Sequence, residues 1–335
     1  MKAVKLISKI FLFFVGGVIA LFLLALIGLH IAKYFVYPDY YKNREVVSKI
    51  PSLNEGFVPQ GLHYDAETDT YIHSGYNASA NDCTELYFVN GKDAKKLLIV
   101  DENGERMVGH AGGVTRVGDY LYVVDNAEEK QGKLGILYVY DYKALQQAKD
   151  GDGVKALSQF TVDTAGSFCF ADSQYIYIGE YYHAGAYETK ESHHFTTPAG
   201  DENKSILSAY ALNADGTLNG EYPVFSVSIP MEVQGFAVTE DGKLAFSTSW
   251  ALNSSHLEIH GEMKDSGTTI GISGKDVPLY YVDSTTRIAD ISMPVFSEGL
   301  SLKDGKIVVS FESACNKYVL GKLFFATKVV SYPVN

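Results

Sequence analysis

The chain has 335 residues, of which 46% are hydrophobic and three are cysteine. This composition excludes a disordered chain and a disulfide-dense miniprotein, and the length fits one large all-β domain. The net charge is −12, whereas nucleic-acid binders carry basic patches, so nucleic acid is not expected as a partner. The 24 tyrosines and 31 glycines favour short strands joined by tight turns.

The first predicted element is a membrane span. Residues 10–32 form an apolar run broken only by His30, and residues 1–9 hold three lysines and no acidic residue. The run is long enough to cross a bilayer and longer than the apolar region of a cleaved signal peptide. We therefore predict an uncleaved signal anchor in the cell membrane, with a cytoplasmic N-terminus and the rest of the chain extracytoplasmic. The alternative is a buried helix of a soluble protein, which is rarely apolar all round.

Residues 33–50 follow as a predicted juxtamembrane stalk, with an aromatic belt at its start. All acidic residues lie after residue 38, so the body should repel anionic headgroups and stand off the membrane on this stalk. Residues 44–49 are also a candidate ring-closing strand, expected to pair with residues 328–334.

Residues 51–335 contain one unit five times. Each unit has a polar or small residue, a central position, an apolar residue and two short strands separated by a turn. The central positions are Gly61, Gly113, Cys169, Gly235 and Gly299. Third strands are expected at residues 85–89, 136–140, 206–211, 278–282 and 320–326, and a fourth strand is visible in most units. Four strands per unit predict a five-bladed β-propeller, with six blades as the alternative.

A ligand-binding face is predicted where the loops that enter the innermost strands meet the loops that leave the second strands. Its predicted residues are Gln60, His110, Asp125, Asn126, Glu180, Gln234, Ser249, Trp250, Glu298 and Glu312. Two long insertions rich in tyrosine and histidine, at residues 179–205 and 250–275, are expected to leave the same face.

Four carboxylates of this face are candidate metal ligands: Asp125, Glu180, Glu298 and Glu312. Together they would suit calcium, which prefers oxygen ligands. Clustered carboxylates can instead raise the pKa of one member for acid–base work. They can also simply bond backbone groups at the blade edges.

The cysteines suggest a crosslink. Cys83 and Cys315 fall in the corresponding loops of units one and five, which are neighbours in a closed ring. We predict a Cys83–Cys315 disulfide, which an oxidising exterior permits; three free thiols are the alternative. Cys169 is expected to be a buried small apolar residue.

Several strings resemble known propellers. Residues 234–244 and 298–307 resemble calcium-dependent propellers of the strictosidine-synthase, lactonase and senescence-marker type, and five-bladed glutaminyl cyclotransferases. Pro-Gln-Gly-Leu at 59–62 and Gly-His-Ala-Gly-Gly-Val at 109–114 resemble membrane-anchored bacterial propellers. In the lactonase-like families the Glu of a Glu-Gly motif ligates the metal, and Glu298 matches it.

The leading functional hypothesis is a monomeric, membrane-anchored binding module whose loop-rich face takes a small molecule, a glycan or a protein. One alternative is a calcium-dependent, lactonase-like hydrolase. The other is a glutaminyl-cyclotransferase-like enzyme in which a carboxylate shuttles protons near Trp250. Fold alone does not choose between binding and catalysis.

Overall fold

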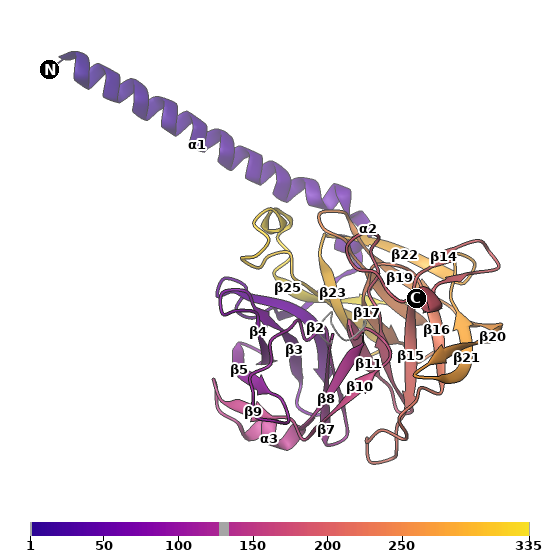
Figure 1. Ribbon diagram of the computed structural model, residues 1–335. Helices are drawn as coiled ribbons and strands as arrows, with labels where there is room; N and C mark the ends of the chain where they lie inside the picture. Colours follow the sequence, from indigo (N-terminus) through magenta and orange to yellow (C-terminus); the bar gives the residue numbers. More distant parts are fainter. Residues whose placement is uncertain (1, 127–133, 335) are drawn as a thin grey trace.

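The computed structural model describes residues 2–126 and 134–334. A long helix, α1 (Lys2–Val36), and a short one, α2 (Pro38–Asn43), lead into strands arranged as five blades around a central axis (Figure 1). In the described part of the chain the five-bladed β-propeller prediction is confirmed, and no sixth blade is formed.

The first three blades follow the repeat units in order. Blade 1 consists of β2 (Phe57–Asp65), β3 (Thr70–Asn77), β4 (Cys83–Asn90) and β5 (Asp93–Val100), with β9 (Gly153–Lys155) parallel to β5. Blade 2 consists of β6 (Gly113–Val117), β7 (Tyr120–Asn126), β8 (Gly135–Asp141) and β10 (Ser158–Val162), with α3 (Tyr142–Gln147) after β8. Blade 3 consists of β11 (Phe168–Ala171), β12 (Tyr175–Gly179), β15 (Ser205–Ala211) and β16 (Phe225–Ile229).

The last two blades complete the ring. Blade 4 consists of β17 (Val233–Val238), β18 (Leu244–Thr248), β19 (Ser255–His260) and β22 (Arg287–Met293). Blade 5 consists of β23 (Ser297–Lys303), β24 (Lys306–Phe311), β25 (Lys328–Pro333) and β1 (Glu45–Lys49). A hairpin of β20 (Lys264–Ile272) and β21 (Lys275–Tyr281) extends blade 3, and β13 (Phe195–Thr196) pairs with β14 (Glu202–Asn203) inside the first insertion. Two 3-10 turns, η2 (Glu191–His193) and η3 (Gly321–Phe324), lie in loops.

Two of the five expected third strands are wrong. Residues 278–282 fall largely in β21, which joins blade 3, and β19 is the third strand of blade 4. Residues 320–326 form a loop around η3, and β25 is the third strand of blade 5. Hydrophobic alternation marks a strand but does not say which blade it joins. The second insertion is therefore not one loop, since β19 begins at Ser255.

The central glycines pack the inner strands against one another. A Cβ atom on Gly113 would lie 2.2 Å from the backbone nitrogen of Cys169 in the next blade, and one on Gly299 would lie 2.5 Å from that of Leu62. Both distances are far below van der Waals contact, so only glycine allows the inner strands to approach this closely. Because Gly299 of blade 5 meets Leu62 of blade 1, the ring is closed.

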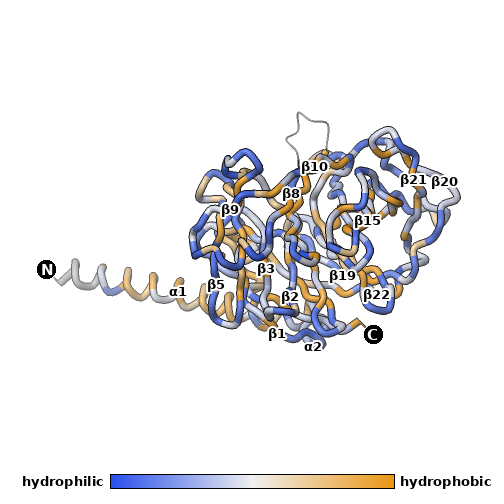
Figure 2. The backbone as a smooth tube through the Cα atoms, turned by 90° about the horizontal axis from the view of Figure 1, so that it is seen from below, coloured by the Kyte–Doolittle hydropathy of each residue, from blue (hydrophilic) through white to orange (hydrophobic). Residues whose placement is uncertain are grey.

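The ring closes within one sheet. β1 pairs antiparallel with β25, with Glu45 opposite Ser331 and Lys49 opposite Lys328. This is the pairing expected from the sequence, and it joins the first strand of the chain to the last. The buried apolar side chains lie between neighbouring blades: Ile72 of blade 1, for example, packs in one cluster with Leu121 and Val123 of blade 2. In Figure 2, orange hydrophobic segments occur throughout the body of the propeller and along α1.

Residues 37–50 do not form a stalk. The side chains of Tyr37 and Tyr40 are only 3% and 1% exposed, and α2 packs on β22 and β25. The Tyr37 hydroxyl lies 3.3 Å from the Ser254 hydroxyl, and Tyr40 packs edge-on against Phe311. Tyr37 and Tyr40, which were expected in an interfacial belt, are therefore core residues, and the segment after them packs on the propeller.

The predicted Cys83–Cys315 disulfide is not present, because all three cysteines are free thiols. Cys83 starts β4, and its backbone bridges to Val108 in the segment that leads to blade 2. Cys315 is buried in the turn after Glu312, where its N–H donates to the Glu312 carbonyl. Units one and five are neighbours, but Cys83 lies on the side of blade 1 that faces blade 2.

Candidate functional site

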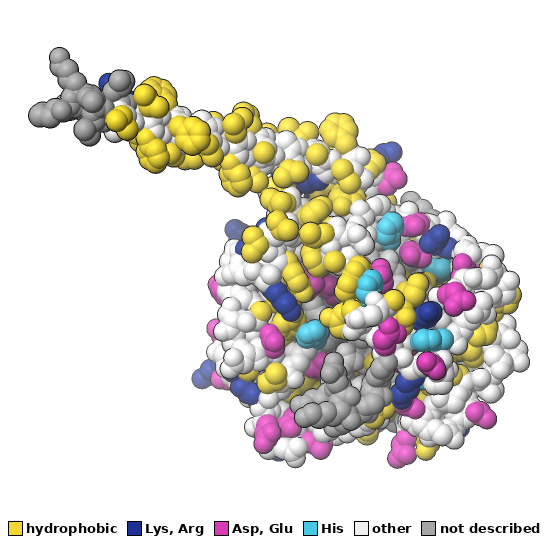
Figure 3. All heavy atoms as spheres, turned by 45° about the horizontal axis from the view of Figure 1, so that its top comes forward, with side chains coloured by type: hydrophobic (Ala, Val, Ile, Leu, Met, Phe, Trp, Pro, Cys, Tyr) yellow, Lys and Arg dark blue, Asp and Glu magenta, His cyan; other side chains and the backbone are white. Residues whose placement is uncertain are grey.

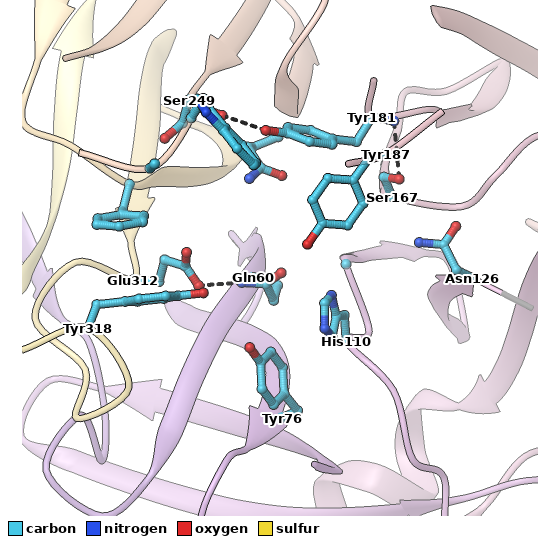
Figure 4. Close-up of a pocket in the computed structure, with 15 residues that line it drawn as sticks. Gln60, Tyr76, His110, Asn126, Ser167, Tyr181, Tyr187, Ser249, Glu312 and Tyr318 are labelled. Carbon is cyan, nitrogen blue, oxygen red and sulfur yellow. Dashed lines mark hydrogen bonds between the residues drawn. The ribbon is translucent and has the colours of Figure 1, made fainter. Parts of the chain in front are cut away.

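A pocket of about 420 Å³ opens at the centre of the propeller and is lined from all five blades (Figure 4). In each blade the central residue of the inner strand pairs with a residue of the second strand. The residue two positions after that partner lies at an equivalent place in every blade. Strand register makes Asn126, Glu180 and Ser249 equivalent, because Gly113, Cys169 and Gly235 pair with residues two positions earlier. Tyr76 and Glu312 hold the same place in blades 1 and 5. Four of these five residues line the pocket, and Glu180 does not.

Seven of the ten predicted site residues line this pocket. They are Gln60, His110, Asn126, Gln234, Ser249, Trp250 and Glu312. The strand-and-turn pattern therefore located the mouth of the propeller from sequence. The other three, Asp125, Glu180 and Glu298, are buried outside the pocket lining.

Asp125 and Glu180 are occupied by local hydrogen bonds. Asp125 accepts from the backbone N–H groups of His110 at 3.2 Å and Asn126 at 2.8 Å. Burial raises the pKa of Asp125 to about 7, and these backbone bonds oppose the rise. Glu180 accepts from His193 Nδ1 at 2.8 Å, and from the backbone N–H groups of Ala165 and Ile206. Both carboxyl groups thus serve the fold.

Glu298 and Glu312 lie against each other in blade 5. Burial raises the pKa of Glu298 well above its usual value, and the charge of Glu312 raises it further. Burial also raises the pKa of Glu312 to about 8, although Lys317, Gln60 and Tyr318 oppose the rise. Both pKa values are raised, so the pair takes up a proton at a higher pH than free carboxyl groups do. Glu298 Oε1 has no hydrogen-bond partner among the described residues.

The open carboxyl of this pair belongs to Glu312. Its Oε2 accepts from the Gln60 amide at 2.9 Å, and Gln60 also donates to the Pro59 carbonyl. Both Gln60 donors are therefore used, which leaves its carbonyl oxygen as an acceptor. In Figure 4 Gln60, Glu312 and Tyr318 lie side by side at the pocket. A protonated Glu312 can donate a hydrogen bond or a proton to a bound molecule.

Stacked aromatic pairs form the pocket walls. His110 stacks on Tyr76 with 4.7 Å between ring centroids, and Phe296 stacks on Tyr318 at 4.5 Å. On another side, Trp250 stacks on His183 at 3.5 Å. Each pair holds its ring in a fixed orientation, so the pocket offers flat apolar faces beside amide, hydroxyl and carboxyl groups.

The four predicted metal ligands do not assemble into one site. Asp125 and Glu180 are bound by backbone groups, and only Glu298 and Glu312 lie together. Across residues 2–126 and 134–334, no group of three or more His, Cys, Asp and Glu side chains is placed to hold a metal ion. Calcium takes six to eight oxygen ligands, so this donor set does not fit the calcium prediction.

Sequence reasoning missed several pocket residues. Tyr76 could have been predicted from the repeat, because it holds the position in unit one that Glu312 holds in unit five. Tyr181 and Tyr187 lie in the tyrosine-rich insertion that was expected to leave this face, and the Tyr181 hydroxyl donates to the Ser249 carbonyl. Phe296 and Tyr318 carry no sequence signal, because they lie in irregular loops of blade 5.

Comparisons with known proteins do not show a family for this chain. No protein-family model and no curated protein matches the chain. Among solved structures, it is similar to PQQ-bound aldose sugar dehydrogenase from Streptomyces coelicolor, with 13% identity, 87% of this chain and 80% of that chain covered, and a TM-score of 0.35. Exo-beta-1,3-galactanase from Phanerochaete chrysosporium is 10% identical, with 88% of this chain and 64% of that chain covered and a TM-score of 0.46. BamB from Moraxella catarrhalis is 8% identical, with 83% of each chain covered and a TM-score of 0.31.

Proposed function

We propose that this chain is a single-pass membrane protein whose extracytoplasmic propeller binds a small, uncharged polar ligand, such as a sugar residue, in its central pocket. The observation that carries the proposal is the pocket itself, which combines stacked aromatic walls with amide and carboxyl groups from five blades. An uncharged ligand fits because Glu312 retains proton character at neutral pH. Burial and the charge of Lys317 also lower the pKa of His110, which keeps its imidazole neutral.

The membrane part of the proposal rests on α1. Residues 7–36 form a helix that is long and apolar enough to span a bilayer, and a signal sequence passes the same test. Retention of the helix is favoured by its contacts with the propeller: Lys33 is buried, and the His30 ring packs on Phe325 at 4.8 Å. The three lysines before the apolar run favour a cytoplasmic N-terminus.

The single tryptophan of the chain provides the test, because Trp250 lines the pocket. We would titrate the full chain in nanodiscs with neutral monosaccharides and disaccharides while following Trp250 fluorescence. We expect a saturable change that is weakened in Gln60→Ala and unchanged in Ile288→Ala, which alters an exposed side chain of β22. If no saccharide up to about 50 mM changes the emission, the proposed ligand class is wrong.

A second candidate function is acid–base catalysis on the bound molecule. The raised pKa values of Glu298 and Glu312 favour it, because a carboxylic acid with a raised pKa is what a general acid needs at neutral pH. In this function Glu312 donates the proton, and burial keeps its pKa high. A cyclotransferase-like proton shuttle beside Trp250 is one such reaction. Turnover lost in Glu312→Gln with saccharide binding retained would favour catalysis over binding alone.

A further inference from the structure

The loop that contains the pocket residue Tyr318 contacts α1. This loop, residues 317–325, includes η3, and η3 packs on α1. Phe325 lies 4.8 Å from the His30 ring, and Lys33 Nζ lies 5.0 Å above the Phe325 ring. His30 precedes the end of α1 by six residues, which is about 9 Å along a helix. If α1 spans the membrane, this loop therefore lies at the depth of the headgroup layer.

The loop presents apolar side chains next to the helix. Val319 is 72% exposed and Leu320 is 59% exposed, with Phe325 partly exposed beside them. Lys317 and Lys322 flank these residues, and both ammonium groups bond to neutral partners: Tyr76 for Lys317, and Asn54 and Asn316 for Lys322. Apolar residues flanked by lysines suit the boundary between acyl chains and headgroups. In Figure 3 the hydrophobic surface of α1 continues onto the adjoining part of the propeller.

The same loop borders the pocket. Tyr318 lines the pocket and stacks on Phe296, while Val319 is the next residue along the chain. Between α1 and α2, Tyr37 contacts Ser254, which follows the pocket residues Trp250 and Ala251. The helix therefore joins the propeller beside a loop that borders the pocket.

We propose that the 317–325 loop inserts into the outer surface of the bilayer beside α1 and holds the pocket mouth at the headgroup layer. The proposal commits to a lipid surface as the occupant of the exposed apolar residues, because the loop is continuous with the membrane-spanning helix. Resting on the proposed function, it also names the source of the ligand: the polar headgroup of a lipid in that leaflet.

Fluorescence depth measurement tests the loop. A Cys83→Ser background leaves only buried cysteines, to which Leu320→Cys or Leu157→Cys is added and labelled with an NBD fluorophore. Leu157 is a matched control, because it is a leucine of 57% exposure between β9 and β10, away from α1. The full chain is placed in phosphatidylcholine nanodiscs with and without lipids brominated near the headgroup.

We expect bromolipid to quench the label at position 320 and aqueous iodide to quench the label at position 157. Equal quenching by iodide at both positions, with none by bromolipid at position 320, overturns the insertion. Quenching at position 320 that is lost in detergent and depends on protein concentration in nanodiscs would indicate a second copy of the chain, and would also overturn it.

The source of the ligand is tested through Trp250. Galactosyl diacylglycerol is incorporated into the same nanodiscs, and its effect is compared with that of free galactose. We expect the glycolipid to change Trp250 emission at a mole fraction that corresponds to far less sugar than the free form needs. A response to free galactose alone overturns the lipid source and retains the proposed function. A response to neither contradicts the proposed function, while the bromolipid result still decides the insertion.

Discussion

In blades 3 and 5 a glutamate directly follows the second strand, Glu180 after β12 and Glu312 after β24, but the two carboxyl groups have different surroundings. Glu180 is covered by the first insertion, whose His193 bonds to it, and backbone N–H groups satisfy both of its oxygens. Glu312 has no such cover, and it meets Glu298 and the open pocket. The comparison teaches that one repeat position can serve stability or chemistry, depending on which loop follows the strand.

The largest expected effect tests the role of Glu180. Glu180→Gln keeps the size of the side chain but replaces one accepting oxygen with an NH₂ group that faces a donor. Both oxygens accept hydrogen bonds in the wild type, so the variant should lose about 2–3 kcal/mol of unfolding free energy. Urea denaturation at neutral pH measures it. Loss of under about 0.5 kcal/mol would contradict the structural role.

The same substitution in blade 5 should act in the opposite direction at high pH. The pKa of Glu312 is raised by burial from 4.5 to about 8, so its contribution to stability is present below pH 4.5 and is lost as the pH rises through 8. Glu312→Gln removes this loss. We expect the variant to be more stable than the wild type by at least about 1 kcal/mol at pH 9, and by less at pH 5.

Urea unfolding midpoints of the two proteins at pH 5 and pH 9 measure this difference. Glu312→Asp serves as the control, because it retains an ionisable carboxyl group and should keep a loss at high pH. A wild type and a Glu312→Gln variant with the same pH dependence would show that the buried pair does not titrate as described.

The smallest expected effect concerns the contact between the first insertion, which follows blade 3, and blade 4. The Tyr181 hydroxyl in blade 3 donates to the Ser249 carbonyl in blade 4 at 3.0 Å. Tyr181→Phe removes this one hydrogen bond and leaves the ring, so it should cost about 0.5–1.5 kcal/mol. Thermal unfolding measures it, and Tyr222→Phe, which alters an exposed tyrosine elsewhere, should change nothing. A loss above about 3 kcal/mol would show that the first insertion depends on this bond.

Much of this arrangement could be predicted from the sequence, for a physical reason. The central glycines mark close approach of inner strands, and Gly113 and Gly299 each face the backbone of the next blade. Once the inner strands are located, the loops at one end of the ring must converge, and seven predicted residues do line one pocket. The prediction worked where local geometry fixes position.

It failed where long-range packing decides. Alternating apolar residues do not state that β21 leaves blade 4 for blade 3, or that Tyr40 packs against Phe311 in the body. A carboxylate in sequence looks the same whether backbone N–H groups satisfy it, as at Asp125, or another acid opposes it, as at Glu298. Hydrogen-bond partners of this kind come from loop paths, which have no periodicity.

The pairing of β1 with β25 has a consequence for the order in which the chain folds. β1 is synthesised soon after α1, whereas its partner lies at the C-terminal end, so blade 5 is completed after the other blades have been made. Until then the β1 segment has no partner strand, and β24 keeps an open edge that can pair wrongly. Loss of β25 would therefore leave blade 5 without the strand that joins β24 to β1. A nascent propeller is protected from misassociation only when this last strand has been added.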